Sequence, residues 1–406
     1  MSKPAVLLKF KLIRIRTIER NLDSICRTPR LNREELLRYT HRPMLIQESF
    51  DEVEQQKPSI LQSLETRFHL LSIFDDPWIK HLQADPRTTE EYLRKVVLKG
   101  ETSCRAQLKK LITASNTVLR ELGPWASERY LLSVINAFQS RTREQLFYID
   151  SVEQSESDYL SAFFENLALV QEYPDSPNTR NISPKVNVLV DLLLQELQQI
   201  ETLEDDEVEE TRSSLTGIVF VETRIVVCVL KLLLQCHPSI KDQLRLGLSF
   251  GTSAHPSRKN MMSDCVMKDK SIEDIEVVLD DLRSGAKNLL ISTNVVEEGI
   301  DITACNRIIS FDPPKNLVSF VQRRGRARDA KSKYFIMFPR NQVATGVAKW
   351  QQAEEEMIKM YMDQMREIQE LDESESLQGE NRVYHVETTG YVQYVSFLKP
   401  MLILIY

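Results

Sequence analysis

The sequence predicts an α/β fold in which a parallel sheet follows a long all-helical segment. Between residues 59 and 168, apolar residues recur at intervals of three and four, which is the spacing of amphipathic helices. Beyond residue 184, apolar runs of four to seven residues alternate with helical segments, as in a parallel sheet buried on both faces. Glycine accounts for only 11 of 406 residues, well below the typical ~7%, which favours long helices over a glycine-rich β-fold.

The helical segment is justified by its apolar periodicity and by where its glycines fall. Apolar residues from Leu61 to Leu71 keep helical spacing, and further helices are predicted near 106–122 and after Pro124. Gly100 and Gly123 both stand where helices are expected to end. The proline-containing stretch QEYPDSPNTRNISP closes the segment as a linker.

The second segment is predicted to contain the parallel sheet, over residues 184–342. It opens with the helical stretch KVNVLVDLLLQELQQI, and the stretch IEDIEVVLDDLRSG is a helix that ends at Gly285. The predicted strands lie in GIVFVETR (217–224), NLLISTN (288–294), NRIISFD (306–312) and KYFIMF (333–338). A helix is expected again over 344–371, with apolar residues on one face and acidic residues on the other.

Charge is unevenly distributed along the chain. The net charge is −7, yet residues 1–42 hold eleven Lys and Arg against four Asp and Glu. The acidic stretch 201–210 holds seven acidic residues and no basic residue, and is predicted to be a solvated loop. Nucleic-acid binding must therefore be judged from local clusters rather than from the whole-chain charge.

The cysteines and the apolar runs exclude several classes of protein. Six cysteines without a CxxC pair argue against a disulfide framework or a zinc site, and favour reduced thiols in a cytoplasmic protein, with a nuclear location as the alternative. No apolar run approaches the ~18 residues of a membrane helix, so no membrane partner is expected.

Two stretches carry residues suited to chemistry. Ser292–Ile302 leaves a predicted strand with small hydroxyl residues and a glycine between acids, and loops at the carboxyl ends of parallel strands bind ligands. Gln322–Arg328 places four arginines around a glycine, a cluster of planar donors suited to phosphate. Taken alone, the second stretch is also compatible with a solvated basic face.

Together, with the strand NRIISFD between them, these stretches resemble motifs V and VI of superfamily 2 helicases, and GIVFVETR resembles motif IV. The stretches SICRTPRLNREELLRYTHRP, LGPWASERY, SPKVNVLVDLLL and ENRVYHVETTG further resemble fungal Dicer-like proteins, most closely their antiviral class. RIG-I-like receptors and archaeal-type DNA helicases, which also carry a helical insert, are the alternatives. The resemblance implies a RecA-like helicase C-terminal domain with a preceding helical insert and a following helical pincer.

The resemblance also implies roles on the nucleotide side. Gln322, Arg326 and Arg328 match the motif VI positions that face the γ-phosphate of ATP, the two arginines acting as fingers on the transferred phosphoryl group. Gly299 and Asp301 match nucleotide-side positions of motif V.

On the RNA side, Thr293 of motif V matches a position that contacts RNA phosphate. Arg224 and Arg324 are also assigned to RNA, and Arg323 is expected to be structural or RNA-facing. Contacts of this kind position a double-stranded RNA without reading its sequence.

The implied division of the chain covers its full length. The predicted parts are a basic lead-in (1–44), the helical insert (45–183), the second RecA-like domain (184–342), the helical pincer (343–378) and the start of a Dicer dimerisation domain (379–406). Both ends depart from the family, so the sequence is expected to represent the interior of a Dicer-like protein.

Three catalytic signatures are not found in this sequence: GxxxxGK[ST], DExH and the acid-rich ribonuclease III motif. ATP with Mg²⁺ is therefore expected only when a first RecA-like domain completes the site, and the chain alone is expected to lack ATPase and ribonuclease activity. The expected partners are double-stranded RNA, ATP and the rest of a Dicer-like protein acting in antiviral RNA silencing. A stand-alone RNA-binding or regulatory protein is the alternative.

Overall fold

A computed structural model describes residues 43–144, 151–165, 167, 171–204, 215–250, 275–294, 305–327, 331–345, 347–356 and 359. Almost all of the predicted basic lead-in, residues 1–42, lies outside these residues, as does the final segment 379–406. Within the described residues, no helix is long and apolar enough to cross a membrane.

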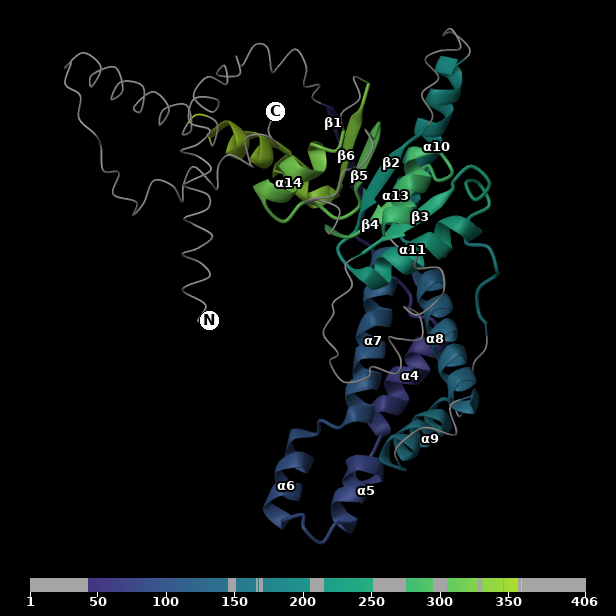
Figure 1. Cartoon of the computed structure of the whole chain (residues 1–406), viewed down its shortest axis with the longest axis vertical. Helices are drawn as coiled ribbons and strands as arrows, with labels where there is room; N and C mark the ends of the chain where they lie inside the picture. The colour runs from purple at the N-terminus through teal and green to yellow at the C-terminus, as the bar shows by residue number, and fades with distance from the viewer. Residues whose placement is uncertain are drawn as a thin grey trace, which may run out of the picture. The chain divides into compact units, whose positions relative to one another are not determined.

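The centre of the fold is a six-stranded sheet in the order β1-β6-β5-β2-β4-β3, and every pairing in it is parallel (Figure 1). The strands are β1 (Met44–Phe50), β2 (Gly217–Phe220), β3 (Leu246–Ser249), β4 (Leu289–Ser292), β5 (Arg307–Ser310) and β6 (Lys333–Pro339). All residues of β2, β4 and β5 are buried, as expected for a parallel sheet covered on both faces. The predicted parallel α/β sheet is thus confirmed.

The helices of the sheet domain lie between successive strands in the sequence or follow the last strand, β6. They are α10 (Pro184–Glu204), α11 (Arg224–Cys236), α13 (Ile275–Arg283), α14 (Leu317–Arg324) and the 3₁₀ helix η4 (Arg340–Thr345), followed by a helix over residues 347–356. The Thr223 side chain caps α11 by accepting from the Val226 N–H, and the Asn316 side chain caps α14 in the same way. The caps lie three residues after β2 and six residues after β5, so they fix where each helix begins beyond its strand.

Two strands of the sheet differ from the sequence prediction. Residues 45–50, within the range predicted as the helical insert, form most of the edge strand β1 beside β6. β3 was not predicted either, and it extends the sheet on its other side. The helix α10 continues to Glu204, so the acidic stretch begins as a helix and not as a loop; residues 205–214 lie outside the described part.

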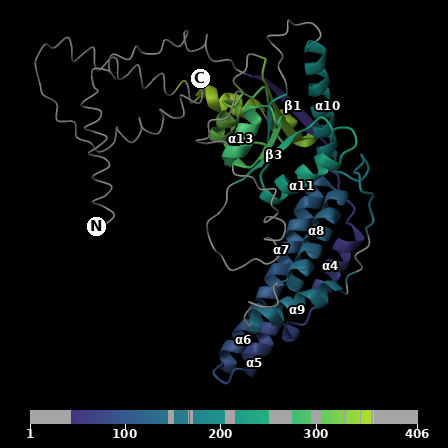
Figure 2. The same ribbon diagram turned by 45° about the vertical axis from the view of Figure 1, so that its right-hand side comes forward.

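The described part of the predicted helical segment consists of helices joined by short loops (Figure 2). Its elements are α4 (Ser59–Leu70), η1 (Ile73–Asp75), α5 (Pro77–Ala84), α6 (Glu90–Lys99), α7 (Ser103–Leu122), α8 (Pro124–Glu144) and α9 (Ser151–Glu165). α7 contacts α4, α8 and α9, and it also contacts α10 and α11 of the sheet domain. Buried apolar side chains of both parts belong to one hydrophobic cluster, so the insert and the sheet share a core.

Gly123 makes the junction between insert and sheet domain possible. Its φ of +100° is a conformation that other residues rarely adopt, and a Cβ atom there would lie 2.5 Å from the backbone nitrogen of Ser183. The Ser183 N–H donates to the Leu122 carbonyl at 3.0 Å. The end of α7 therefore lies directly against the segment that leads into α10.

Candidate functional site

The carboxyl ends of β2, β3, β4 and β5 meet at one edge of the sheet. The Thr293 N–H, just after β4, donates to the Ser249 carbonyl of β3 at 3.2 Å, and the Asp312 N–H, just after β5, donates to the Phe220 carbonyl of β2 at 3.3 Å. Ligands of open α/β sheets bind at this edge. We call these four carboxyl-terminal strand ends the exit edge; the term refers to the ends of the strands and not to an outermost strand.

Arg323 of α14 ties the arginine run to the exit edge. Its guanidinium is 2% exposed and donates to the Ser310 hydroxyl at 2.9 Å, the Asp312 carbonyl at 2.8 Å and the Asn294 side chain at 3.0 Å. It also lies over the Phe220 ring, 4.9 Å from the centroid. The side chain is therefore structural: it joins the ends of β2, β4 and β5 to α14.

Arg324 points to a different partner. Its two terminal nitrogens contact the two carboxylate oxygens of Glu354 at 2.5 and 2.6 Å, and both side chains are at least nine-tenths buried. Phe320, beneath Arg324, stacks on Trp350 with ring centroids 6.2 Å apart. The structure therefore pairs Arg324 with the helix over 347–356, whereas RNA contact by Arg324 stays a prediction.

Of the residues predicted to face nucleotide, the structure describes Gln322 and Arg326. Both are less than a tenth exposed, at 6% and 7%. The Arg326 carbonyl accepts from the Cys305 N–H at 3.2 Å, which places the end of the arginine run beside the approach to β5. Arg328, Gly299 and Asp301 lie outside the described residues.

The remaining predicted RNA residues lie on the exit edge. Thr293 follows β4 directly and is 7% exposed, and Arg224 is the first residue of α11, half-buried, four residues after β2 ends. Arg323 connects this group with the motif VI residues, because it neighbours Gln322 and contacts Asn294, the residue after Thr293.

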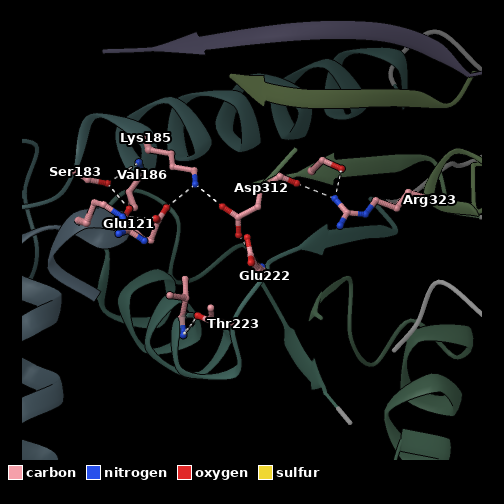
Figure 3. A network of polar contacts seen from close by, with 11 residues as sticks. Glu121, Ser183, Lys185, Val186, Glu222, Thr223, Asp312 and Arg323 are labelled. Atoms are coloured by element: carbon pink, nitrogen blue, oxygen red, sulfur yellow. Dashed lines mark hydrogen bonds and ion pairs between the residues drawn. The ribbon is translucent and has the colours of Figure 1, made fainter. Parts of the chain in front are cut away.

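A buried lysine that the sequence analysis did not single out extends this arrangement toward the insert (Figure 3). The Lys185 ammonium lies 2.7 Å from a carboxylate oxygen of Glu121, near the end of α7, and 2.6 Å from Oδ1 of Asp312. The second oxygen of Asp312 accepts from the Glu222 N–H at 2.6 Å. Figure 3 shows Lys185 pointing between the two carboxylates, with Arg323 on the far side of Asp312.

The positive charges in this group stabilise the ionised form of Glu121. Burial raises the pKa of the Glu121 carboxyl, but Lys185 and Arg120 outweigh that effect, so the pKa is lowered below its ordinary value. Lys185 also lies 4.0 Å from the centroid of the Phe311 ring. The signal in the sequence was a lysine at the start of an amphipathic helix, SPKVNVLVDLLL, directly after the linker.

Comparison with known proteins bears on the family. Residues 206–331 match the family model of the helicase conserved C-terminal domain. The chain is 36% identical over 370 residues to Dicer-like protein 2 of Neosartorya fischeri, 35% over 369 residues to that of Aspergillus fumigatus and 35% over 389 residues to that of Aspergillus oryzae. These matches cover 90%, 89% and 93% of this chain.

The chain spans about a quarter of the length of these curated relatives, namely 25%, 25% and 26%. Among solved structures, the helicase domain of Pyrococcus furiosus Hef matches with a TM-score of 0.34 at 16% identity, covering 76% of this chain and 58% of that one, a likeness too weak to support an inference. The similarity to Dicer-like proteins, the parallel sheet and the matched domain agree with one another. The chain is therefore a relative of the fungal Dicer-like proteins that contains a RecA-like helicase C-terminal domain.

Proposed function

We propose that this chain serves as the RNA-engaging helicase C-terminal part of a Dicer-like protein, working with ATP on double-stranded RNA in antiviral RNA silencing in the cytoplasm. The observation that supports this most directly is the attachment of α14 to the exit edge by Arg323. This attachment holds motif VI, expected to face nucleotide, next to Asn294 of the stretch expected to face RNA. The ranges 343–378 and 379–406 stay predictions as pincer and dimerisation domain.

The proposed nucleotide side rests on Gln322, Arg326 and Arg328. Buried arginine and amide donors suit the oxygens of a triphosphate, and arginines stabilise the charge that develops in phosphoryl transfer. The proposed substrate is ATP. A first RecA-like domain would supply the P-loop that binds the phosphates and the ligands of Mg²⁺. We therefore propose that the chain alone has neither ATPase nor ribonuclease activity of its own.

Titration of the full chain with a fluorescent duplex RNA at several salt concentrations tests the proposed RNA role. Binding that falls linearly with the logarithm of salt concentration would report phosphate contacts. Arg224→Ala is expected to weaken binding and to reduce the magnitude of the salt slope by about 1. Arg245→Ala is the matched control. It removes an exposed arginine directly before β3, at the amino-terminal ends of the strands and therefore opposite the exit edge.

An RNA-stimulated ATPase assay of the same preparation tests the proposed division of labour. Turnover is expected to stay at the buffer background, with or without duplex RNA. Clear turnover that Arg326→Ala abolishes would show that the chain completes its own nucleotide site. Failure to bind duplex RNA even at low salt would instead remove the proposed RNA role.

A further inference from the structure

Lys185 is the point at which the helical insert, α10 and the exit edge meet. Its side chain is only 8% exposed, and its ammonium contacts Glu121 of α7 and Asp312 after β5, residues 64 and 127 positions away in the sequence. A lysine so buried is stable as a cation only when carboxylates surround it. Lys185 therefore holds α7 and β5 together through charge.

Asp312 passes this attachment on to the arginine run. One carboxylate oxygen accepts from Lys185 and the other from the Glu222 N–H, while the Asp312 backbone carbonyl accepts from Arg323 at 2.8 Å. The side chain thus joins β5 to the end of β2, and the backbone of the same residue joins it to α14. A shift of Asp312 would move a hydrogen-bond acceptor of Arg323.

The insert side of the attachment is equally tight. The Ser183 hydroxyl donates to the Glu121 carbonyl at 2.6 Å and accepts from the Val186 N–H at 3.2 Å. Gly123 lies so close to Ser183 that a Cβ atom would not fit. The end of α7 and the start of α10 are therefore fixed together on either side of Lys185.

We propose that Lys185 is a positioning residue. It transmits the position of the helical insert to the end of α14 that carries Arg323, so that a movement of the insert moves this end of α14. Among the described residues, Lys185 is the cation that pairs with both carboxylates, whereas the exposed Arg120 pairs with Glu121 alone. Without Lys185, the carboxylates of Glu121 and Asp312 would face each other across a buried space, and like charges in such a setting repel. This inference rests on the proposed function in one respect: duplex RNA that reaches from the exit edge to the insert would alter the arginine run by this route.

Hydrogen exchange of the full chain, followed by mass spectrometry, tests the positioning role without any ligand. In Lys185→Met, exchange is expected to accelerate about tenfold both at the α7–α10 junction and in α14, residues 317–324. Lys185→Arg, which keeps the charge, is expected to restore most of the protection. Lys315→Met removes an exposed lysine, 58% exposed, that pairs with Glu222 of the same edge, and is the matched control. Acceleration confined to the junction would overturn the proposal.

A second arm adds duplex RNA at a concentration that saturates the wild-type chain. In the wild type, the RNA is expected to change exchange in both the insert and α14. In Lys185→Met the change in α14 is expected to be smaller, because only direct contact of the RNA with the exit edge remains. An equal change of α14 in both proteins would overturn the proposed route. A wild-type chain that binds no RNA would refute the proposed function, and the ligand-free arm would still decide the role of Lys185.

Should Lys185→Met not fold, Glu121→Gln combined with Asp312→Asn provides the same test, because this pair removes both charges that the lysine connects. The acceleration of exchange in α14 is then expected to be larger in the double variant than the sum of the accelerations in the two single variants. Purely additive effects would show that the two carboxylates do not act through a common lysine, and would contradict the proposal.

Discussion

Strand β5 carries a largely buried polar cluster at each end, and the shared group is a carboxylate in one cluster and a lysine in the other. At its amino end, Arg307 and Lys333 share the single carboxylate of Glu196, which is 6% exposed. At its carboxyl end, Lys185 is shared by the two carboxylates of Glu121 and Asp312. Helix α10 supplies Glu196 to one cluster and Lys185 to the other, so it is fixed to the sheet at two places.

The two clusters also differ in what they connect. The amino-end cluster joins α10 to the beginnings of β5 and β6, with Gln199 of α10 accepting from Lys333 at 2.6 Å. The carboxyl-end cluster connects α7 of the insert, α10, β5 and, through Asp312, α14. The first cluster therefore stabilises the sheet domain internally, whereas the second connects the helical insert with the arginine run.

Removing the single shared cation should have the largest effect. Lys185→Met removes the cation of Asp312 and leaves Glu121 with only the exposed Arg120, and breaking a buried ion pair from one side costs about 3–5 kcal/mol. We expect the free energy of unfolding, measured by urea denaturation, to fall by about 5 kcal/mol. Adding Glu121→Gln and Asp312→Asn should recover part of this loss. A fall below about 1 kcal/mol would contradict the importance given to charge balance.

The pair Arg324–Glu354, with one cation for one carboxylate, provides an intermediate case. Both side chains are at most a tenth exposed and contact each other through two bonds. Arg324→Met leaves one buried carboxylate unpaired, so we expect a loss of about 3 kcal/mol, together with faster hydrogen exchange in the helix over 347–356. Glu354→Gln, which keeps an acceptor for Arg324, should cost less than Arg324→Met.

At the amino end of β5, Glu196 has two cations, so either one still neutralises the carboxylate when the other is removed. Arg307→Met leaves Glu196 bound to Lys333 at 2.8 and 3.0 Å, so we expect a loss of about 1.5 kcal/mol from the missing charge-assisted hydrogen bonds. The double variant Arg307→Met with Lys333→Met should lose more than the sum of the two single variants. A simple sum would mean that the two cations do not substitute for one another.

These contacts also show what the sequence could and could not predict. β2, β4, β5 and β6 were predicted because each is an apolar run with clear boundaries, and α10 because its apolar spacing is helical. β1 was missed because MLIQESF mixes polar and apolar residues and becomes a strand only by pairing with β6, far along the chain. β3, LGLS, has Gly247 in its interior and lacks the β-branched residues found in β2, β4 and β5, so it carries little strand signal.

The candidate site was predictable in its motifs and not in its connections. The arginine run and the stretch after β4 were recognised from their residues, and Arg323 does connect the two. The ion pairs could not be inferred, because Arg324 and Glu354 are 30 positions apart and Lys185 and Asp312 are 127 apart. Only the folded sheet brings such residues together, since the pairing depends on the order in which parallel strands assemble.

A smaller effect should appear on acidification. The pKa of Glu121 is lowered by Lys185 and Arg120 in spite of its burial, so its contribution to stability is present above the unfolded pKa of about 4.5 and is lost as the pH falls through the lower, folded pKa. Glu121→Gln should therefore show a flatter decline of unfolding free energy below pH 4.5 than the wild type. Parallel declines would mean that Glu121 titrates no differently in the folded and unfolded chains.

The smallest effect is expected for Lys315, which lies on the same exit edge as Lys185 and also contacts a carboxylate. Lys315 and Glu222 are 58% and 51% exposed, and exposed pairs of this kind contribute about 0–1 kcal/mol. Lys315→Met should therefore change the unfolding free energy by less than about 0.5 kcal/mol, and added salt should abolish even that. Because Glu222 also bonds to Asp312 through its backbone N–H, a loss comparable to that of Lys185→Met would show that any cation on this edge matters. A negligible loss would show that burial, and not proximity to Asp312, makes Lys185 the cation on which the edge depends.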